Sequence, residues 1–150
     1  MNKTKKGFTL IELLVVIAII GLLATLSIIA LNSAQAKARD VKRLSDVREI
    51  RTALEMYFAS ENEYPAEDSI TGGAEIAADG AIFMRSYPTP PTPIDGSECA
   101  NTTPGTLSYH YVLDGTRSEG NQSYTVHFCL GSDVSEISAG PRTMTPAGIY

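Results

Sequence analysis

The sequence predicts an α+β protein in which one long N-terminal α-helix packs on a small antiparallel β-sheet head. Two patterns predict this fold. A continuous apolar run leads into an amphipathic stretch, and short alternating segments follow in a second half that is rich in Gly and Pro. The chain has 150 residues, 43% of them hydrophobic. This length leaves no room for a second domain of ordinary size.

The apolar run at residues 8–31 predicts a transmembrane helix. Almost every residue in this range is apolar or small, and at about 1.5 Å per residue the segment can cross a hydrocarbon core of about 30 Å. Residues 1–7 precede it as a predicted cytoplasmic leader peptide, with Lys3, Lys5 and Lys6 and no acid. The positive-inside rule therefore predicts a cytoplasmic N-terminus, with the rest of the chain on the outer side of the membrane.

Residues 32–60 are predicted to continue the same helix as an amphipathic segment. No proline occurs before Pro65, and apolar positions recur at spacings of three and four with charged residues between them. This period indicates a helix that lays one apolar stripe on a globular partner. The stripe comprises Val41, Leu44, Val47, Ile50, Leu54, Tyr57 and Phe58.

Residues 61–150 form the predicted β head. It begins with a connector loop, in which residues 87–93 (YPTPPTP) predict an extended polyproline-like conformation. Apolar residues alternate in 109–113 and again in 124–130, with a turn-rich stretch between them. This pattern predicts a β-hairpin whose apolar face covers the helix.

Two further features of the predicted sheet depend on that hairpin. A third strand, at residues 136–139 or 148–150, is only weakly marked. If the hairpin register is symmetric about its loop, His110 and His127 face each other on the side opposite the tyrosines. We do not expect a zinc site there, because no third ligand stands at a suitable spacing.

Charge is unevenly distributed along the chain. The net charge is −5, yet residues 32–60 carry a slight basic excess while acids strongly outnumber bases in 61–150. An acidic head is a poor match for phosphate, whose recognition needs clustered Lys and Arg. Nucleic acid is therefore not an expected partner of the head.

Cys99 and Cys129 are the only cysteines. Both lie on the predicted outer side of the membrane, where a disulfide can form. Closing a loop of about 30 residues would stabilise the head by about 3 to 4 kcal/mol on the chain-entropy model. Two free buried thiols are the alternative.

Glu12 is the one carboxylate inside the apolar run. A charge at bilayer depth costs about 2.5 to 3.5 kcal/mol on insertion scales, so this residue needs a compensating partner. If the chain is cut after Gly7, Phe8 becomes a new terminus with a positively charged amine one helical turn away. The carboxylate can compensate that amine or the amine of an adjacent copy; alternatively, Glu12 only stabilises its own helix N-terminus through the dipole.

The segment GFTLIELLVV, preceded by basic residues, resembles the N-terminal signature of type IV pilins and pseudopilins. The resemblance implies that a prepilin peptidase cleaves between Gly7 and Phe8 and methylates the new amine of Phe8. It also implies that Glu12 is an assembly residue. An ordinary secretory signal is a rival interpretation, because Ala34-Gln35-Ala36 imitates a cleavage site; its apolar core would, however, be about 7–15 residues long and uncharged.

The resemblance further implies a structural subunit rather than an enzyme. We expect a homo-oligomeric type IV pilus filament serving adhesion, motility or uptake, with other pilins or pseudopilins and an inner-membrane assembly platform as partners. The alternative is a pseudopilin of a type II secretion or DNA-uptake system, and a monomeric membrane-anchored binding protein is a third possibility. The chain would first span the inner membrane in lipid and then enter an extracellular pilus or periplasmic pseudopilus.

The sequence departs from the pilin pattern within the apolar helix. The proline that many pilins carry in the outer half of the apolar helix is missing, so Gly21 must supply any helix flexibility, or else permits close helix packing.

Some pseudopilin heads bind calcium, and Asp95, Asp114 and Asp133 are the weak candidates for its ligands here. They form no EF-hand pattern, and no metal or other cofactor is expected.

Overall fold

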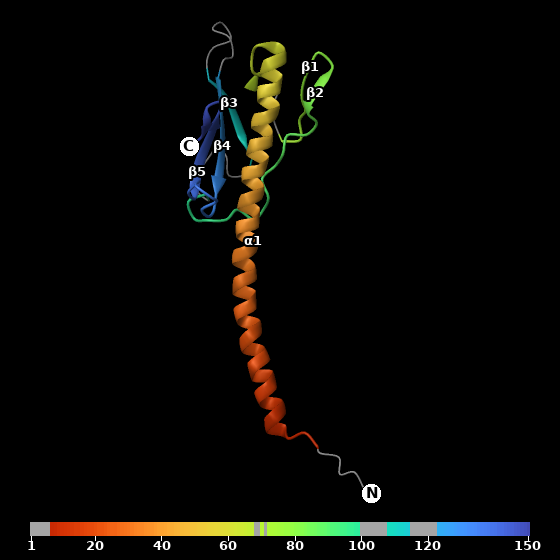
Figure 1. Ribbon diagram of the computed structural model, residues 1–150, viewed down its shortest axis with the longest axis vertical. Helices are drawn as coiled ribbons and strands as arrows, with labels where there is room; N and C mark the ends of the chain where they lie inside the picture. Colours follow the sequence, from red (N-terminus) through yellow and green to blue (C-terminus); the bar gives the residue numbers. More distant parts are fainter. Residues whose placement is uncertain (1–6, 68–69, 71, 100–107, 115–122) are drawn as a thin grey trace. The chain divides into compact units, whose positions relative to one another are not determined.

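The computed structural model describes residues 7–67, 70, 72–99, 108–114 and 123–150. The predicted leader, including Lys3, Lys5 and Lys6, therefore lies outside the described residues except for Gly7. The chain divides into two compact units, Met1–Gln35 and Ala36–Tyr150, and each is described by itself. One long helix and two antiparallel sheets make up the described secondary structure, so the predicted α+β class is confirmed (Figure 1).

The helix α1 spans Leu10–Glu61, close to the predicted range. It ends where Asn62 adopts a left-handed backbone conformation with φ of 58°. The Asn62 amide donates to the Phe58 carbonyl at 2.8 Å, which closes the last turn. Asparagine tolerates this conformation better than most residues, so the helix stops here without glycine.

In the first unit, the helical segment is apolar and exposed along its whole length. By length and composition, α1 contains a stretch that is able to cross a membrane. Its large apolar side chains lie on every face of the helix, as Leu10 at 82% and Ile29 at 68% exposure illustrate. A helix that is apolar all round needs an apolar environment, because leaving such a surface in water is strongly unfavourable.

In the second unit, four antiparallel strands form the main sheet in the order β3-β4-β5-β6. The strands are β3 (His110–Asp114), β4 (Ser123–Leu130), β5 (Gly140–Thr145) and β6 (Gly148–Ile149). The pairing of β3 with β4 confirms the predicted hairpin, including the register that places His110 opposite His127. The predicted turn of this hairpin lies outside the described residues from 115 to 122.

The third strand differs from the prediction. The strand that pairs with β4 on the side away from β3 is β5, which begins just after the proposed range 136–139. Within that range, Ile137 forms an isolated bridge with Val134. The other proposed range, 148–150, overlaps β6. The sequence of β5, GPRTMT, has one large apolar residue, Met144, and therefore lacks the alternation that marks a strand.

A second sheet consists of β1 (Ile76–Ala78) and β2 (Ala81–Met84), which the sequence analysis missed. Their turn is Asp79-Gly80, with φ of 46° and 83°. An Asp-Gly pair between short apolar runs is a strong hairpin signal, because both residues of such a turn take positive φ. That signal was present in the sequence, but the strands are very short.

The core of the second unit lies between the later part of α1 and the main sheet (Figure 1). The helix contributes an apolar stripe, and the inward faces of β3 and β4 contribute aromatic and aliphatic side chains that alternate with outward polar ones. Most of the predicted stripe is buried, but Val41 is 51% exposed. The fully buried helix residues include Val47, Ile50 and Leu54.

Candidate processing and assembly site

Residues 7–12 form the start of α1, and Thr9 caps it. The Thr9 hydroxyl accepts from the Glu12 amide at 3.3 Å, while the Glu12 carboxylate accepts from the Thr9 amide at 2.9 Å and from the Thr9 hydroxyl at 2.7 Å. This reciprocal arrangement is a capping box, which satisfies amide groups that would otherwise lack partners at the helix start. Glu12 thus stabilises its own helix N-terminus, the more modest of the two roles predicted for it.

Gly7 and Phe8 stand just before the capped helix. A Cβ atom built on Gly7 would meet no atom within 4 Å among the described residues, so the fold of this chain does not itself require glycine there. Phe8 is 81% exposed. The described residues therefore leave this stretch of the chain uncovered, and the role of Gly7 and Phe8 as a processing site stays a prediction.

Gly21 lies within the apolar part of α1, where the helix continues without interruption. A Cβ on Gly21 would also meet no described atom within 4 Å. The nearby hydroxyl groups are satisfied locally, since Thr25 donates to the Leu22 carbonyl and Ser27 to the Leu23 carbonyl, each at 2.8 Å. The role of Gly21 in helix flexibility or packing stays a prediction.

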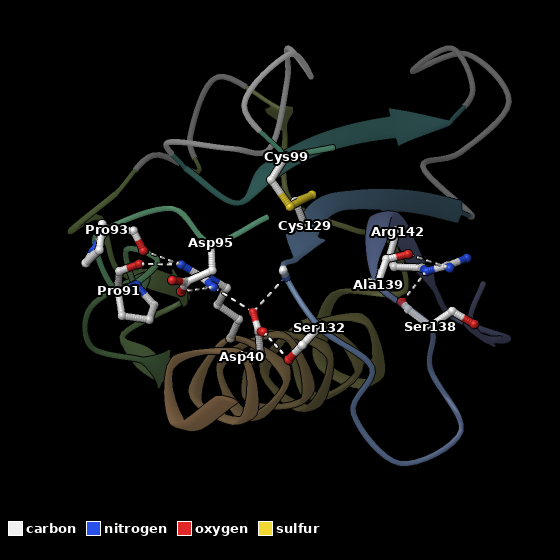
Figure 2. The surroundings of a disulfide bond; sticks show 12 residues. Asp40, Pro91, Pro93, Asp95, Cys99, Cys129, Ser132, Ser138, Ala139 and Arg142 are labelled. Carbon is white, nitrogen blue, oxygen red and sulfur yellow. Dashed lines mark hydrogen bonds and ion pairs between the residues drawn. A yellow bond between two sulfur atoms is a disulfide. The ribbon is translucent and has the colours of Figure 1, made fainter. Parts of the chain in front are cut away.

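The second unit contains a partly buried ionic cluster of Arg39, Asp40, Arg43 and Asp95. Figure 2 shows two of its members, Asp40 and Asp95. Arg43 is 3% exposed and Asp40 is completely buried. The Arg43 guanidinium donates to Asp40 at 2.6 Å and to Asp95 at 3.3 Å. Arg39 binds the same Asp95 carboxylate with two hydrogen bonds of 2.7 Å. The ionic cluster therefore joins the helix to the segment that follows the connector.

The ionic cluster also holds main-chain groups. Arg43 donates to the carbonyl oxygens of Pro91 at 2.8 Å and Pro93 at 2.9 Å. Asp40 accepts from the Gly131 amide at 2.9 Å and from the Ser132 hydroxyl at 2.7 Å. Two loops distant in sequence, the connector and the turn after β4, are thereby fastened to one helical turn (Figure 2).

The charges of the ionic cluster shift one another's titration. Hydrogen bonds from Arg39, followed by those from Arg43, hold the pKa of Asp95 below its usual range despite partial burial. The Asp95 carboxylate in turn raises the pKa of Arg39. One turn further along, Asp46 is buried, accepts from the Tyr109 hydroxyl at 2.9 Å and raises the pKa of Lys42, which donates to it.

The sequence analysis missed Asp40, Arg43 and Asp46 as core residues. The buried positions Leu54, Ile50 and Val47 continue at helical spacing through Arg43 and Asp40. The spacing alone thus predicts that these charged residues face the head. Val41 follows Asp40 directly in the sequence, so its side chain lies on a different face of the helix and is exposed.

Cys99 and Cys129 form the predicted disulfide. The bond links the segment after the connector to β4 and closes a loop with a sequence separation of 30 (Figure 2). Both cysteines are buried, and neither is free. The alternative of two free thiols was wrong.

The three candidate calcium ligands are engaged separately. Asp95 belongs to the ionic cluster, Asp114 accepts from the Thr125 hydroxyl at 2.6 Å, and Asp133 accepts from the Ala139 amide at 2.8 Å. In the part of the chain that the structure describes, no group of three or more His, Cys, Asp or Glu residues is placed to hold a metal ion. The geometry therefore gives no support to these acids as a common calcium site.

Comparison with known proteins agrees with the N-terminal resemblance. Residues 2–28 match the family model described as the prokaryotic N-terminal methylation motif. The chain is 39% identical to the type II secretion system core protein G of Aeromonas hydrophila over 86 residues, which is 57% of this chain and 60% of that relative. No solved structure matches the chain.

Pilus proteins are similar as well. Identity is 35% over 86 residues with a fimbrial protein of Neisseria meningitidis serogroup B, covering 57% of this chain and 51% of the relative. It is 30% over 108 residues with the type IV major pilin protein PilA of Myxococcus xanthus, covering 65% and 49%. The chain thus spans about half to three fifths of the length of these relatives.

Proposed function

Because the chain carries the N-terminal methylation motif and resembles both type IV pilins and type II secretion core protein G, we propose that it is a structural filament subunit. In this proposal a prepilin peptidase processes the chain, which then polymerises into a type IV pilus for adhesion, motility or uptake. The similarity to core protein G supports a second candidate, a pseudopilin of a type II secretion or DNA-uptake system. We assign no enzymatic activity to the chain.

The observation that carries the proposal is the exposed apolar helix beginning immediately after the Gly7-Phe8 bond. A single chain leaves large side chains such as Ile11, Leu22 and Ile29 uncovered. Each fully exposed side chain of this size forgoes about 1.5 to 3 kcal/mol of burial free energy. Lipid covers this surface before assembly, and the same segments of neighbouring copies cover it in the filament.

Processing follows from the chemistry at residues 7 and 8. The peptidase hydrolyses the Gly7–Phe8 peptide bond with one water, which releases the leader with a carboxylate on Gly7 and leaves a free amine on Phe8. A methyl-donor cosubstrate then transfers its methyl group to this amine, which gives up a proton. The open surroundings of Gly7 support a glycine selected by the peptidase rather than by the fold. Lys3, Lys5 and Lys6 support a cytoplasmic leader, so cleavage would occur at the cytoplasmic side of the inner membrane.

Assembly uses the carboxylate of Glu12. The capping box with Thr9 holds this carboxylate at the helix N-terminus, close in sequence to the amine that processing creates. A charge in an apolar surrounding is strongly favoured to pair with an opposite one, because an unpaired buried charge is far costlier. Pairing with the Phe8 amine of an adjacent copy on an assembly platform would turn that cost into a driving force for polymerisation.

Mass spectrometry and electron microscopy of the native protein test the proposal together. We expect the mature chain to begin at a methylated Phe8 and to be recovered in fibres sheared from the cells or retained in the periplasm. Long surface fibres would support the pilus, and short periplasmic fibres the pseudopilus. A chain that keeps Met1 to Gly7 and remains monomeric in membranes would overturn both candidates and favour an anchored binding protein.

A further inference from the structure

Two histidines lie directly opposite each other on neighbouring strands of the head. His110 in β3 pairs with His127 in β4 in the antiparallel register. Their chain neighbours Tyr111, Val126 and Phe128 are buried in the core. Because successive side chains of a strand alternate between faces, both imidazoles lie on the face turned away from the core.

The two rings are close enough to act together. Their centroids are 6.0 Å apart and their planes are tilted by 39°. Both residues are half-buried. His110 Nδ1 is buried and has no hydrogen-bond partner among the described residues. A buried imidazole nitrogen without a partner loses hydration without compensation, so a ligand at that nitrogen would remove an unfavourable feature of the head.

Although the sequence offered no third protein ligand and so no expected zinc site, we propose that His110 and His127 together bind one divalent transition-metal ion of the class of Cu²⁺ or Zn²⁺, with water completing the coordination. Imidazole nitrogen is the preferred protein ligand of these ions, at metal–nitrogen distances of about 2.0 to 2.1 Å. The separation of 6.0 Å between the ring centroids is compatible with both rings binding a common ion. Hard ions such as Ca²⁺ prefer oxygen ligands and are not expected at this pair.

The position of the pair gives such an ion a structural consequence. β3 is an edge strand of the main sheet, whereas β4 is an inner strand that the disulfide at Cys129 ties to the segment after the connector. An ion held by one histidine from each strand links the edge strand to this anchored strand. Metal binding should therefore raise the melting temperature of the head, because it favours the folded state over the unfolded one.

The direct test is a Cu²⁺ titration of the full-length protein without an affinity tag in detergent micelles, followed by electron paramagnetic resonance. The chain has only two histidines, so imidazole ligation can come from no other residues. We expect one Cu²⁺ per chain with coupling to two imidazole nitrogens. A spectrum with one imidazole nitrogen, or with none, would overturn the proposal.

Variants make the test quantitative. His110→Gln and His127→Gln should each weaken Cu²⁺ and Zn²⁺ binding at least about tenfold, since losing a ligand costs no less than losing the outer-shell partner of a ligand. Asp114→Asn is the matched control. It removes a carboxylate from β3, where Asp114 pairs with Ser123 of β4, and should bind the metal as the wild type does. Unchanged affinity in either histidine variant would overturn the proposal, as would equally effective competition by Ca²⁺. Circular dichroism checks that each variant is folded, and the wild-type spectrum decides the question independently of the variants.

Discussion

Asp40 and Arg43 lie one turn apart on α1, and the buried Arg43 guanidinium donates to the Asp40 carboxylate at 2.6 Å. Neither charge is left alone, because Arg43 also reaches Asp95 and two carbonyls while Asp40 accepts from Gly131 and Ser132. Such a fully connected network is stabilised only as a whole, since removing one member leaves a buried charge without its partner.

Arg43→Ala should therefore destabilise the head by about 3 to 5 kcal/mol, the usual effect of breaking a buried ion pair. Arg43→Lys should restore little, because one ammonium group cannot reproduce the planar fork that serves two carbonyls and two carboxylates. Thermal unfolding followed by circular dichroism measures the difference. Arg48→Ala, at an exposed position of the same helix, is the control and should change stability by less than about 0.5 kcal/mol. Equal melting temperatures for the Arg43 and Arg48 variants would contradict this account.

Glu12→Gln separates the two roles of Glu12. Glutamine can complete a capping box with Thr9, but it carries no charge to pair with an amine. We expect normal membrane insertion, measured by carbonate extraction, and a loss of most filament yield, measured in sheared or periplasmic fractions. Ser27→Ala, which removes a polar group from the same apolar segment, should assemble normally. Wild-type filament yield in Glu12→Gln would assign this residue to helix capping alone.

Gly7→Val should block removal of the leader. A Cβ atom at residue 7 would meet no described atom within 4 Å, so this chain tolerates the start of a side chain there, whereas the larger residue would obstruct the proposed peptidase site. The expected product is an inserted precursor whose mass includes residues 1–7, with no detectable mature chain. Gly21→Ala changes a glycine with equally open surroundings and should be processed normally. Mature Gly7→Val chains beginning at Phe8 would refute the assigned cleavage site.

The ionic cluster predicts an acid-sensitive head. The pKa of Asp95 is lowered in the folded state by Arg39 and Arg43, so the unfolded chain binds protons more readily. This contribution is present above the ordinary aspartate pKa of about 3.9 and is lost as the pH falls below it toward the folded value. Melting temperatures between pH 7 and pH 3 should thus fall more steeply for the wild type than for Asp95→Asn. Parallel curves would show that Asp95 contributes nothing to acid unfolding.

The helix and the β3–β4 hairpin could be predicted because both have strong periodic signals. The apolar run and the stripe of α1 extend over many turns, and alternation in β3 and β4 even gave the pairing of His110 with His127. β5 could not be found in this way, because Met144 is the one large apolar residue in its sequence. What defines β5 as a strand is its pairing with β4. Its place in the sheet is determined by tertiary pairing rather than by local pattern.

The candidate site divides in the same manner. Gly7, Phe8 and Glu12 lie within six residues of one another and form a recognisable motif. The disulfide could be predicted because the chain has two cysteines, both on the predicted outer side of the membrane. The ionic cluster combines residues separated by more than 50 positions, such as Arg39 and Asp95. No local signal connects them, and charged residues are rarely buried unless they are paired. The spacing of Asp40 and Arg43 with the apolar stripe was the only available indication.

The way in which Arg43 holds the connector affects how freely its sequence can change. The guanidinium binds the carbonyl oxygens of Pro91 and Pro93, which every amino acid possesses, whereas the side chains of Thr89 and Thr92 are exposed. Substitutions at these two threonines alter the outer surface while the attachment to the helix persists. The identity of the residues on this part of the connector is therefore free to drift, because the anchoring atoms belong to the main chain.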